Sequence, residues 1–185
     1  MKNKPLAFID VETTGLKSGY HEIIEVCIIT PKQTYHQRVK PIFLTRIDPA
    51  ATAVNGYSPK EWENAITPKE AAQDIAYILK NHIICGHNPR FDIDFIEDLC
   101  WRNEVDVRID RRIVDTQTLA YVYLVPMGIK RLSLDTIRAF LGWEVRPQHN
   151  AYDDVLDTKR LYFTLINPWK RIYYYIRAQL GKLTK

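Results

Sequence analysis

Two acidic residues near the N-terminus could do chemistry together. Asp10 and Glu12 stand two positions apart at the end of the apolar segment 5–11. If this segment is a β-strand, both side chains project from the same face and lie next to each other. Burying unpaired acids is costly, and Mg²⁺ or Mn²⁺ is the usual counter-charge for a set of oxygen ligands. Taken alone, the pair fits a metal site and a solvated turn equally well.

Two later segments add acids of the same kind. HNPRFD (87–92) ends on Asp92 at the expected start of a helix, and HNAYDD (149–154) places His149 five residues before Asp154. Carboxylates on three separate elements, with a histidine beside the last, are the composition of a two-metal site with a general base. Asp153 is the less favoured alternative to Asp154 as the fourth acid.

The elements that must position these acids are predicted from apolar patterning. Segments 5–11, 22–30 and 33–42 predict three antiparallel strands, the last at an edge because it is polar and contains a proline. Further strands are predicted at 82–87 and 112–116. Helical spacing predicts a helix over 67–79, a second that begins near residue 91, and a third that follows the strand at 112–116 and ends at 125. Two more helices are predicted over 133–141 and 151–166. This order predicts an α/β fold with a mixed five-stranded sheet flanked by helices.

Composition and cysteine usage narrow the class of protein. The chain has 185 residues, 46% hydrophobic and 26% charged, which is typical of one globular domain. Cys27, Cys85 and Cys100 are odd in number and lie in apolar surroundings, which favours reduced thiols in a reducing compartment. No apolar run approaches the ~20 residues of a membrane span. The N-terminal segment lacks the apolar core of a secretory signal. We therefore expect a soluble, cytoplasmic protein without membrane contact.

The ordered motifs resemble a known enzyme family. FIDVETTGL (8–16), HNPRFD and HNAYDD are similar to the three exonuclease motifs of the DnaQ-like 3′–5′ exonucleases, across residues 5–166. NGYSP (55–59), VDT (114–116) and LSLDTI (132–137) also match features of that family. A sister branch has Tyr where this chain has Asn150, so the resemblance is to the DEDDh branch. That branch includes the proofreading subunit of bacterial DNA polymerase and stand-alone relatives. The resemblance implies a ribonuclease H-like fold, with three antiparallel strands followed by two parallel ones.

The resemblance also implies roles for individual residues. Two Mg²⁺ or Mn²⁺ ions would be held by four acids, and one histidine would be the catalytic base. Contacts to the terminal nucleotide would come from the turn after the first strand, with Leu16 as a wedge beside a base. His87 and Asn88 would shape the turn that delivers Asp92, and are counted with the substrate-binding residues. The implied catalytic residues are Asp10, Glu12, Asp92, His149 and Asp154, of which the four acids bind metal, and the implied substrate-binding residues are Thr13, Thr14, Gly15, Leu16, His87 and Asn88.

Other polar residues receive structural interpretations. Glu25, in an apolar strand, either hydrogen-bonds behind the acids or faces solvent. Asp115 is expected to cap a helix. His21, His36 and His82 have no companion in sequence and are expected to be structural or exposed.

The implied activity is hydrolysis of phosphodiester bonds from the 3′ end of DNA, releasing nucleoside monophosphates. The substrate would be a single-stranded or frayed 3′ end. An enzyme that trims RNA 3′ ends carries the same motifs and remains an alternative. A non-catalytic nucleic-acid-binding protein on the same fold is a third, disfavoured because every catalytic position holds the required residue type. The chain contains no polymerase domain, so proofreading would need a polymerase or another protein partner.

The C-terminal segment differs from the rest in charge. Five of the 26 Lys and Arg residues lie in 167–185 and none of the 22 acidic residues does, so residues 1–166 are nearly neutral. We predict an exonuclease domain over 1–166 and a basic, aromatic helical extension over 167–185. The extension has an apolar stripe made of Trp169, Ile172, Tyr173, Ile176, Leu180 and Leu183. The stripe is expected to pack on the domain. The basic side either faces water or extends a nucleic-acid groove, and binding of a partner or a second copy remains open.

Overall fold

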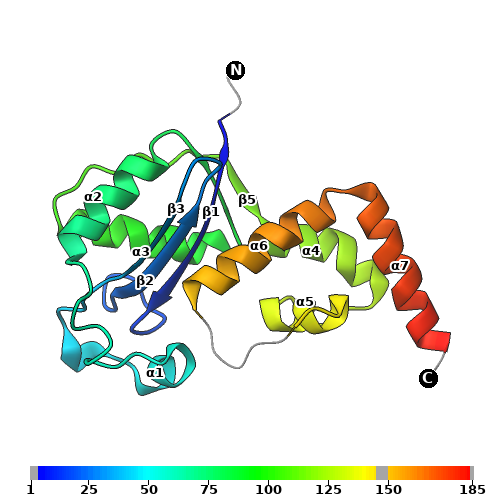
Figure 1. Ribbon diagram of the computed structural model, residues 1–185, viewed down its shortest axis with the longest axis horizontal. Helices are drawn as coiled ribbons and strands as arrows, with labels where there is room; N and C mark the ends of the chain where they lie inside the picture. Colours follow the sequence, from blue (N-terminus) through cyan, green and yellow to red (C-terminus); the bar gives the residue numbers. More distant parts are fainter. Residues whose placement is uncertain (1–3, 145–149, 184–185) are drawn as a thin grey trace.

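Five strands form one mixed sheet at the centre of the protein. The computed structural model describes residues 4–144 and 150–183 (Figure 1). The strands are β1 (Leu6–Thr13), β2 (Ile23–Ile29), β3 (Thr34–Arg38), β4 (Ile83–Gly86) and β5 (Ile113–Asp115), in the spatial order β3-β2-β1-β4-β5. β1, β2 and β3 are antiparallel neighbours, whereas β4 is parallel to β1 and β5 is parallel to β4. The predicted fold class is confirmed.

The third strand is shorter than predicted. β3 ends at Arg38, and Val39 instead forms an isolated parallel bridge with Ile66. Further along, the backbone N–H groups of Ile42 and Phe43 donate to the carboxylate of Glu22, at 2.7–3.1 Å. Because these N–H groups bond to a side chain, this stretch leaves the sheet. It leads into the short helix η1 (Leu44–Arg46) and α1 (Pro49–Asn55).

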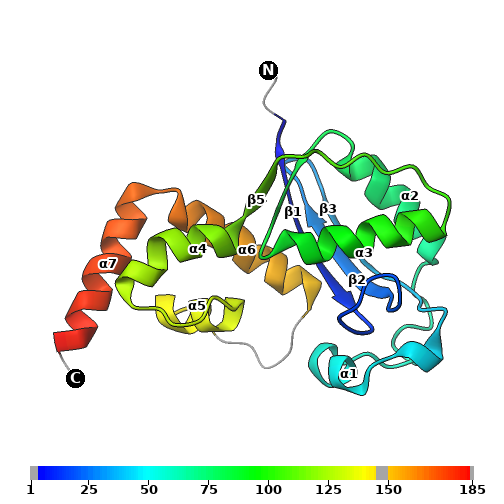
Figure 2. The ribbon, with the colours of Figure 1, turned by 180° about the vertical axis from the view of Figure 1, so that it is seen from behind.

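One face of the sheet is covered by α2 (Pro68–Leu79) and α3 (Pro89–Arg102). Figure 2 shows these two helices from their own side. α2 begins in a capping box, in which Thr67 and Glu70 satisfy each other's backbone N–H groups. α3 begins at Pro89, two residues earlier than the predicted start. The buried residues on this side include Ala7, Ile9 and Val11 of β1, so the odd-numbered side chains of β1 point to α2 and α3.

The opposite face is covered by α6 (Ala151–Leu165), whose Ala151 and Val155 pack on Phe8 of β1 (Figure 1). The even-numbered positions of β1 therefore point to α6, and these include Asp10 and Glu12. The three cysteines are all buried and free, as predicted. None of the helices in the described ranges is long and apolar enough to span a membrane.

A second apolar cluster lies beside the sheet. It joins α6 to α4 (Thr116–Leu124), η2 (Val125–Met127) and α5 (Leu134–Leu141) through residues such as Leu124, Ile137 and Leu161. α7 (Pro168–Leu183) follows α6 and contacts both α6 and η2. Figure 1 shows this group of helices on one side of the sheet.

The predicted orientation of α7 is wrong. Four residues of the stripe expected to pack on the domain, Trp169, Ile172, Tyr173 and Ile176, are at least half exposed. The side chains of Leu180 and Leu183, the other two, lie outside the described part of the structure. The helix instead docks through Tyr174, which packs on the second apolar cluster, and through hydrogen bonds. Arg177 donates to the backbone oxygen of Leu141 (2.9 Å), and the Tyr174 hydroxyl accepts from Nε1 of Trp143 (3.1 Å). The last carbonyls of a helix lack partners within it, so the end of α5 attracts Arg177, and this rotates the apolar stripe outward.

Candidate active site

Three carboxylates converge where β1 meets the start of α6. Asp10 and Glu12 come from β1 and Asp154 from the first turn of α6. One carboxylate oxygen of each lies within 4.8 Å of the others. Side chains alternate between the two faces along β1, which places Asp10 and Glu12 on the face covered by α6. The packing of Val155 on Phe8 brings Asp154 over them.

Asp92 reaches the same place from the other side of the sheet. It lies in the first turn of α3, is buried, and accepts a hydrogen bond from the backbone N–H of Val11 at 3.0 Å. That N–H belongs to the residue between Asp10 and Glu12, so the bond ties α3 to β1 within the site. Asp10, Glu12, Asp92 and Asp154 all line one hollow of about 220 Å³.

Two of the acids in this hollow, Asp10 and Asp92, ionise less readily than an aspartate in water. Burial, followed by the charges of Asp92 and other neighbouring carboxylates, raises the pKa of Asp10 well above its usual 3.8. Burial raises the pKa of Asp92 to about 8. A cation placed among these oxygens would offset both effects, since an opposite charge favours the ionised form. A set of oxygen donors alone suits Mg²⁺ or Mn²⁺, so the residues fit the expected metals.

Asp154 also contacts a residue that the sequence analysis missed. Arg138 of α5 donates to Asp154, to Asp157 at 2.7 Å and to Asp135 at 2.6 Å, and its own side chain is only 2% exposed. A signal was present in the sequence. Arg138 occupies a core position in the pattern Leu134, Ile137, Arg138, Leu141, where an apolar residue is the norm.

Of the two neighbouring acids at the start of α6, Asp154 joins the cluster. Asp153 takes part in the helix cap: its backbone N–H donates to Asn150 at 2.8 Å, and its carboxylate accepts from the Asn150 side chain at 2.8 Å. His149, the predicted base, lies outside the described residues. Its role therefore remains a prediction.

Glu25 lies behind the acids. It stands directly opposite Glu12 in the β1–β2 register, is buried, and has an oxygen 2.6 Å from Nε2 of His36. The His36 ring in turn stacks on Tyr152 of α6, with 5.4 Å between ring centroids. Of the two interpretations offered for Glu25, the structure supports the hydrogen-bonded one.

The turn after β1 uses most of its predicted substrate-binding residues to hold itself together. The Thr13 hydroxyl donates to the backbone oxygen of Gly15 (2.7 Å), and the Thr14 hydroxyl accepts from the N–H of Glu22 (2.9 Å). A Cβ on Gly15 would lie 2.4 Å from the His21 ring, so any larger residue there would have to displace that ring. Leu16 differs, because it is 83% exposed at the tip of the turn. Of the four predicted substrate-binding residues in this turn, Leu16 is the one whose side chain is exposed to a ligand.

His87 and Asn88 border the hollow and shape its rim. Nε2 of His87 lies 2.6 Å from the backbone oxygen of Leu132, and burial lowers the pKa of this histidine. Asn88 has φ 65°, and its N–H donates to Asp115 at 3.0 Å. Asp115 also accepts from the N–H of Gln117 as the cap of α4, as predicted. These bonds fix the turn from which α3 carries Asp92.

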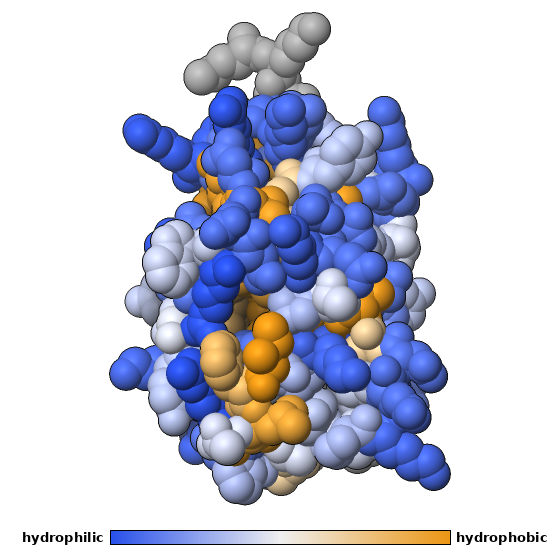
Figure 3. Space-filling view, turned by 90° about the vertical axis from the view of Figure 1, so that its left-hand side faces the viewer, coloured by the Kyte–Doolittle hydropathy of each residue, from blue (hydrophilic) through white to orange (hydrophobic). Residues whose placement is uncertain are grey.

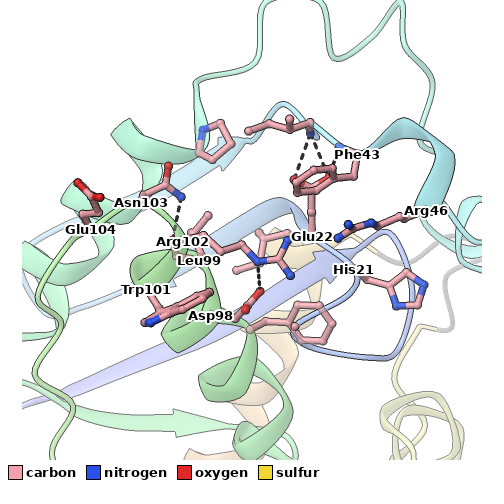
Figure 4. Close-up of a pocket in the computed structure, with 15 residues that line it drawn as sticks. His21, Glu22, Phe43, Arg46, Asp98, Leu99, Trp101, Arg102, Asn103 and Glu104 are labelled. Atoms are coloured by element: carbon pink, nitrogen blue, oxygen red, sulfur yellow. Dashed lines mark hydrogen bonds and ion pairs between the residues drawn. The ribbon is translucent and has the colours of Figure 1, made fainter.

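A larger cavity, of about 580 Å³, lies away from the acids, between the turn after β1 and the end of α3 (Figure 4). Its wall includes Phe43, whose ring contacts the guanidinium of Arg46 at 4.0 Å, and the ion pair of Asp98 with Arg102 at 2.8 Å. Figure 3 shows apolar side chains gathered in the lower half of this side of the molecule. The cavity mixes charges of both signs, and none of the four predicted catalytic acids lines it.

Comparisons with known proteins agree with this geometry. A family model described as exonuclease (RNase_T) matches residues 7–162. DNA polymerase III PolC-type from Thermotoga petrophila is 27% identical over 176 residues, covering 92% of this chain but 12% of that protein. Ribonuclease T from Pectobacterium atrosepticum is 27% identical over 184 residues, covering 89% of this chain and 82% of the relative.

The fold recurs in a solved structure. E. coli exonuclease I in complex with a dT13 oligonucleotide superposes with a TM-score of 0.79 at 20% identity, over 94% of this chain and 43% of that one. The chain thus spans a small part of the PolC-type polymerase and less than half of exonuclease I. The match over residues 7–162 includes the whole carboxylate cluster on the ribonuclease H-like sheet, and the chain therefore belongs to the exonuclease family of DnaQ-like 3′–5′ exonucleases.

Proposed function

We propose that this chain is a two-metal 3′–5′ exonuclease of the DEDDh type, which releases nucleoside monophosphates from the 3′ ends of single-stranded DNA. The observation that carries the proposal is the convergence of Asp10, Glu12 and Asp154 within 4.8 Å, with Asp92 on the same hollow. DNA is favoured because the similar polymerase is a DNA polymerase and the similar exonuclease I was solved with a DNA oligonucleotide. Likeness to Ribonuclease T makes RNA the alternative to be tested.

The four acids are assigned as the residues that hold two Mg²⁺ or Mn²⁺ ions. Such ions, when bound, supply Lewis acidity and neutralise the charge that builds up on the phosphate and the leaving oxygen. The chain's own residues supply the rest. His149 removes the proton of the attacking water. Leu16 projects from the turn beside the hollow and packs against a terminal base, which is a contact that tolerates any base.

The setting of the enzyme is part of the same proposal. The PolC-type relative supports a polymerase as a partner in proofreading. Three buried, free cysteines support a reducing compartment such as the cytoplasm.

The test is degradation of 5′-labelled oligonucleotides, (dT)12 and (rU)12, by purified protein with Mg²⁺ or with EDTA. A ladder that shortens from the 3′ end with Mg²⁺, and is absent with EDTA, is the expected result. Asp10→Ala should abolish the ladder. Asp106→Ala is the matched control, because Asp106 is exposed and remote from the hollow. Degradation in EDTA would refute the metal mechanism, and activity on (rU)12 alone would move the substrate to RNA.

A further inference from the structure

A groove of about 400 Å³ lies between the end of α6 and the start of α7, outside the hollow of the acids. The described residues that line it combine two cations with three aromatic rings and include no carboxylate. The cations are Arg160 and Lys170, and the rings are those of Trp169, Tyr173 and Tyr174. This composition suits a polyanion that also presents flat rings.

The floor of the groove is ordered by contacts with the end of α5. The guanidinium of Arg160 lies 4.1 Å from the centroid of the Trp143 ring. Nε1 of Trp143 donates to the Tyr174 hydroxyl, and the Tyr173 ring meets the Tyr174 ring edge-on at 5.1 Å. Since these contacts join α5, α6 and α7, the arrangement of charge and rings exists before any ligand binds.

The walls remain open to solvent. Trp169 is 78% exposed and Tyr173 is 60% exposed, although large aromatic side chains usually bury most of their surface. Within the described ranges, the structure records no ion pair for Arg160 or Lys170. Exposed rings on which bases stack, next to cations that contact phosphates, are how proteins bind single strands without sequence preference.

The groove is within reach of a strand held at the acids. Arg160 lies six residues beyond Asp154 on α6, and Thr164 ten residues beyond it. At about 1.5 Å per residue these positions are roughly 9 and 15 Å along the helix axis. At about 3.4 Å per nucleotide of a stacked strand, this separation corresponds to about three to four nucleotides.

We propose that this groove is a second binding site for the substrate, which takes the single strand about three to four nucleotides before its 3′ end. The inference rests on the proposed function and adds to it. Trp169 and Tyr173 stack on bases, while Lys170 and Arg160 contact phosphates. Arg171 and Arg177 are not part of the site, because neither lines the groove: Arg171 lies over Tyr123, and Arg177 binds the end of α5.

The experiment measures binding in EDTA, so that it is independent of catalysis. Fluorescence anisotropy gives Kd for (dT)12 and (dT)3 with wild type and with Trp169→Ala/Lys170→Ala. The variant should bind (dT)12 about tenfold or more weakly. For (dT)3, which is too short to span from the acids to the groove, the decrease in affinity should be much smaller. The slope of log K against log salt should flatten by about 0.7, because Lys170 no longer neutralises a phosphate.

Trp101→Ala/Lys80→Ala is the matched control. Trp101 is 79% exposed, almost the same as Trp169, and Lys80 is an exposed lysine at the end of α2. This control should bind both oligonucleotides as wild type does. Circular dichroism and the melting temperature verify that both variants fold.

The outcomes separate the groove from the proposed function. If wild type degrades DNA but Trp169→Ala/Lys170→Ala binds (dT)12 with unchanged affinity and salt slope, the groove proposal is wrong. A change in sedimentation with DNA binding unchanged would likewise overturn it, in favour of a contact between copies. If wild type degrades nothing and the variant still binds (dT)12 more weakly, the groove stands and the catalytic proposal fails.

Discussion

Arg138 and Asp154 form an ion pair that links the core to the candidate metal site. The Asp154 carboxylate lies beside those of Asp10 and Glu12, and it also accepts a hydrogen bond from the buried guanidinium of Arg138. The same guanidinium binds Asp157 one turn further along α6. A divalent cation at the acids must therefore share Asp154 with an arginine that also holds α5 against α6.

This pair gives a prediction for stability. Breaking a buried ion pair by removing one partner costs about 3–5 kcal/mol, because the other charge stays buried. Arg138→Met should lose stability in that range, measured by urea unfolding in EDTA. Arg138→Lys should lose less, because it keeps the charge but not the fork that reaches several carboxylates. Arg108→Ala, at an exposed pair, should change stability by at most about 1 kcal/mol. A wild-type midpoint for Arg138→Met would show that the pair does not support the fold.

Asp10 should oppose folding and support catalysis at the same time. Its pKa is raised by burial and by neighbouring carboxylates, so its ionised form is destabilised in the folded protein. Asp10→Asn should raise the melting temperature in EDTA at pH 8 and abolish exonuclease activity. Mg²⁺ should raise the melting temperature of this variant less than that of wild type, because a ligand stabilises the folded protein in proportion to how tightly it binds. A variant that melts below wild type in EDTA would contradict this account.

The stability of the metal-free protein should fall as pH rises. Asp92 has a pKa of about 8 in the folded protein, against an ordinary value of 3.8. An acid of this kind holds its proton more tightly when folded, so its stabilising contribution is complete below about pH 4 and is lost as the pH rises through 8. Melting in EDTA from pH 5 to pH 8.5 tests this, and Asp92→Asn should weaken the dependence. If the melting temperature of wild type rises across this pH range and that of Asp92→Asn does not, the predicted effect of Asp92 has the wrong sign.

His149 should act on turnover and not on binding. General-base help typically contributes 10²–10⁴-fold, so His149→Ala should lower kcat by about that factor. The low-pH limb of the rate profile should disappear, since it would report protonation of this imidazole. Affinity for (dT)12 in EDTA should match that of wild type. A variant with wild-type turnover would place the base on another residue.

Local patterning predicted the sheet and the acids well. Local sequence is enough to predict β1 and the shared face of Asp10 and Glu12, because side chains two residues apart lie on the same face of any strand. The start of α2 was predicted in the same way, from Thr67 as its capping residue. The ordered motifs then indicated which acids meet, since they occur in a family with one topology.

Only the tertiary structure decided how these elements meet. Sequence spacing cannot show that the carbonyl of Leu141 needs a donor, and this contact with Arg177 is what turns the apolar stripe of α7 toward solvent. The pairing of Arg138 with Asp154 spans 16 residues and two helices, and depends on where α5 lies against α6. Hydrophobic periodicity identifies the apolar side of a helix. Long-range hydrogen bonds to Leu141 and Trp143 determined which side of α7 faces the protein.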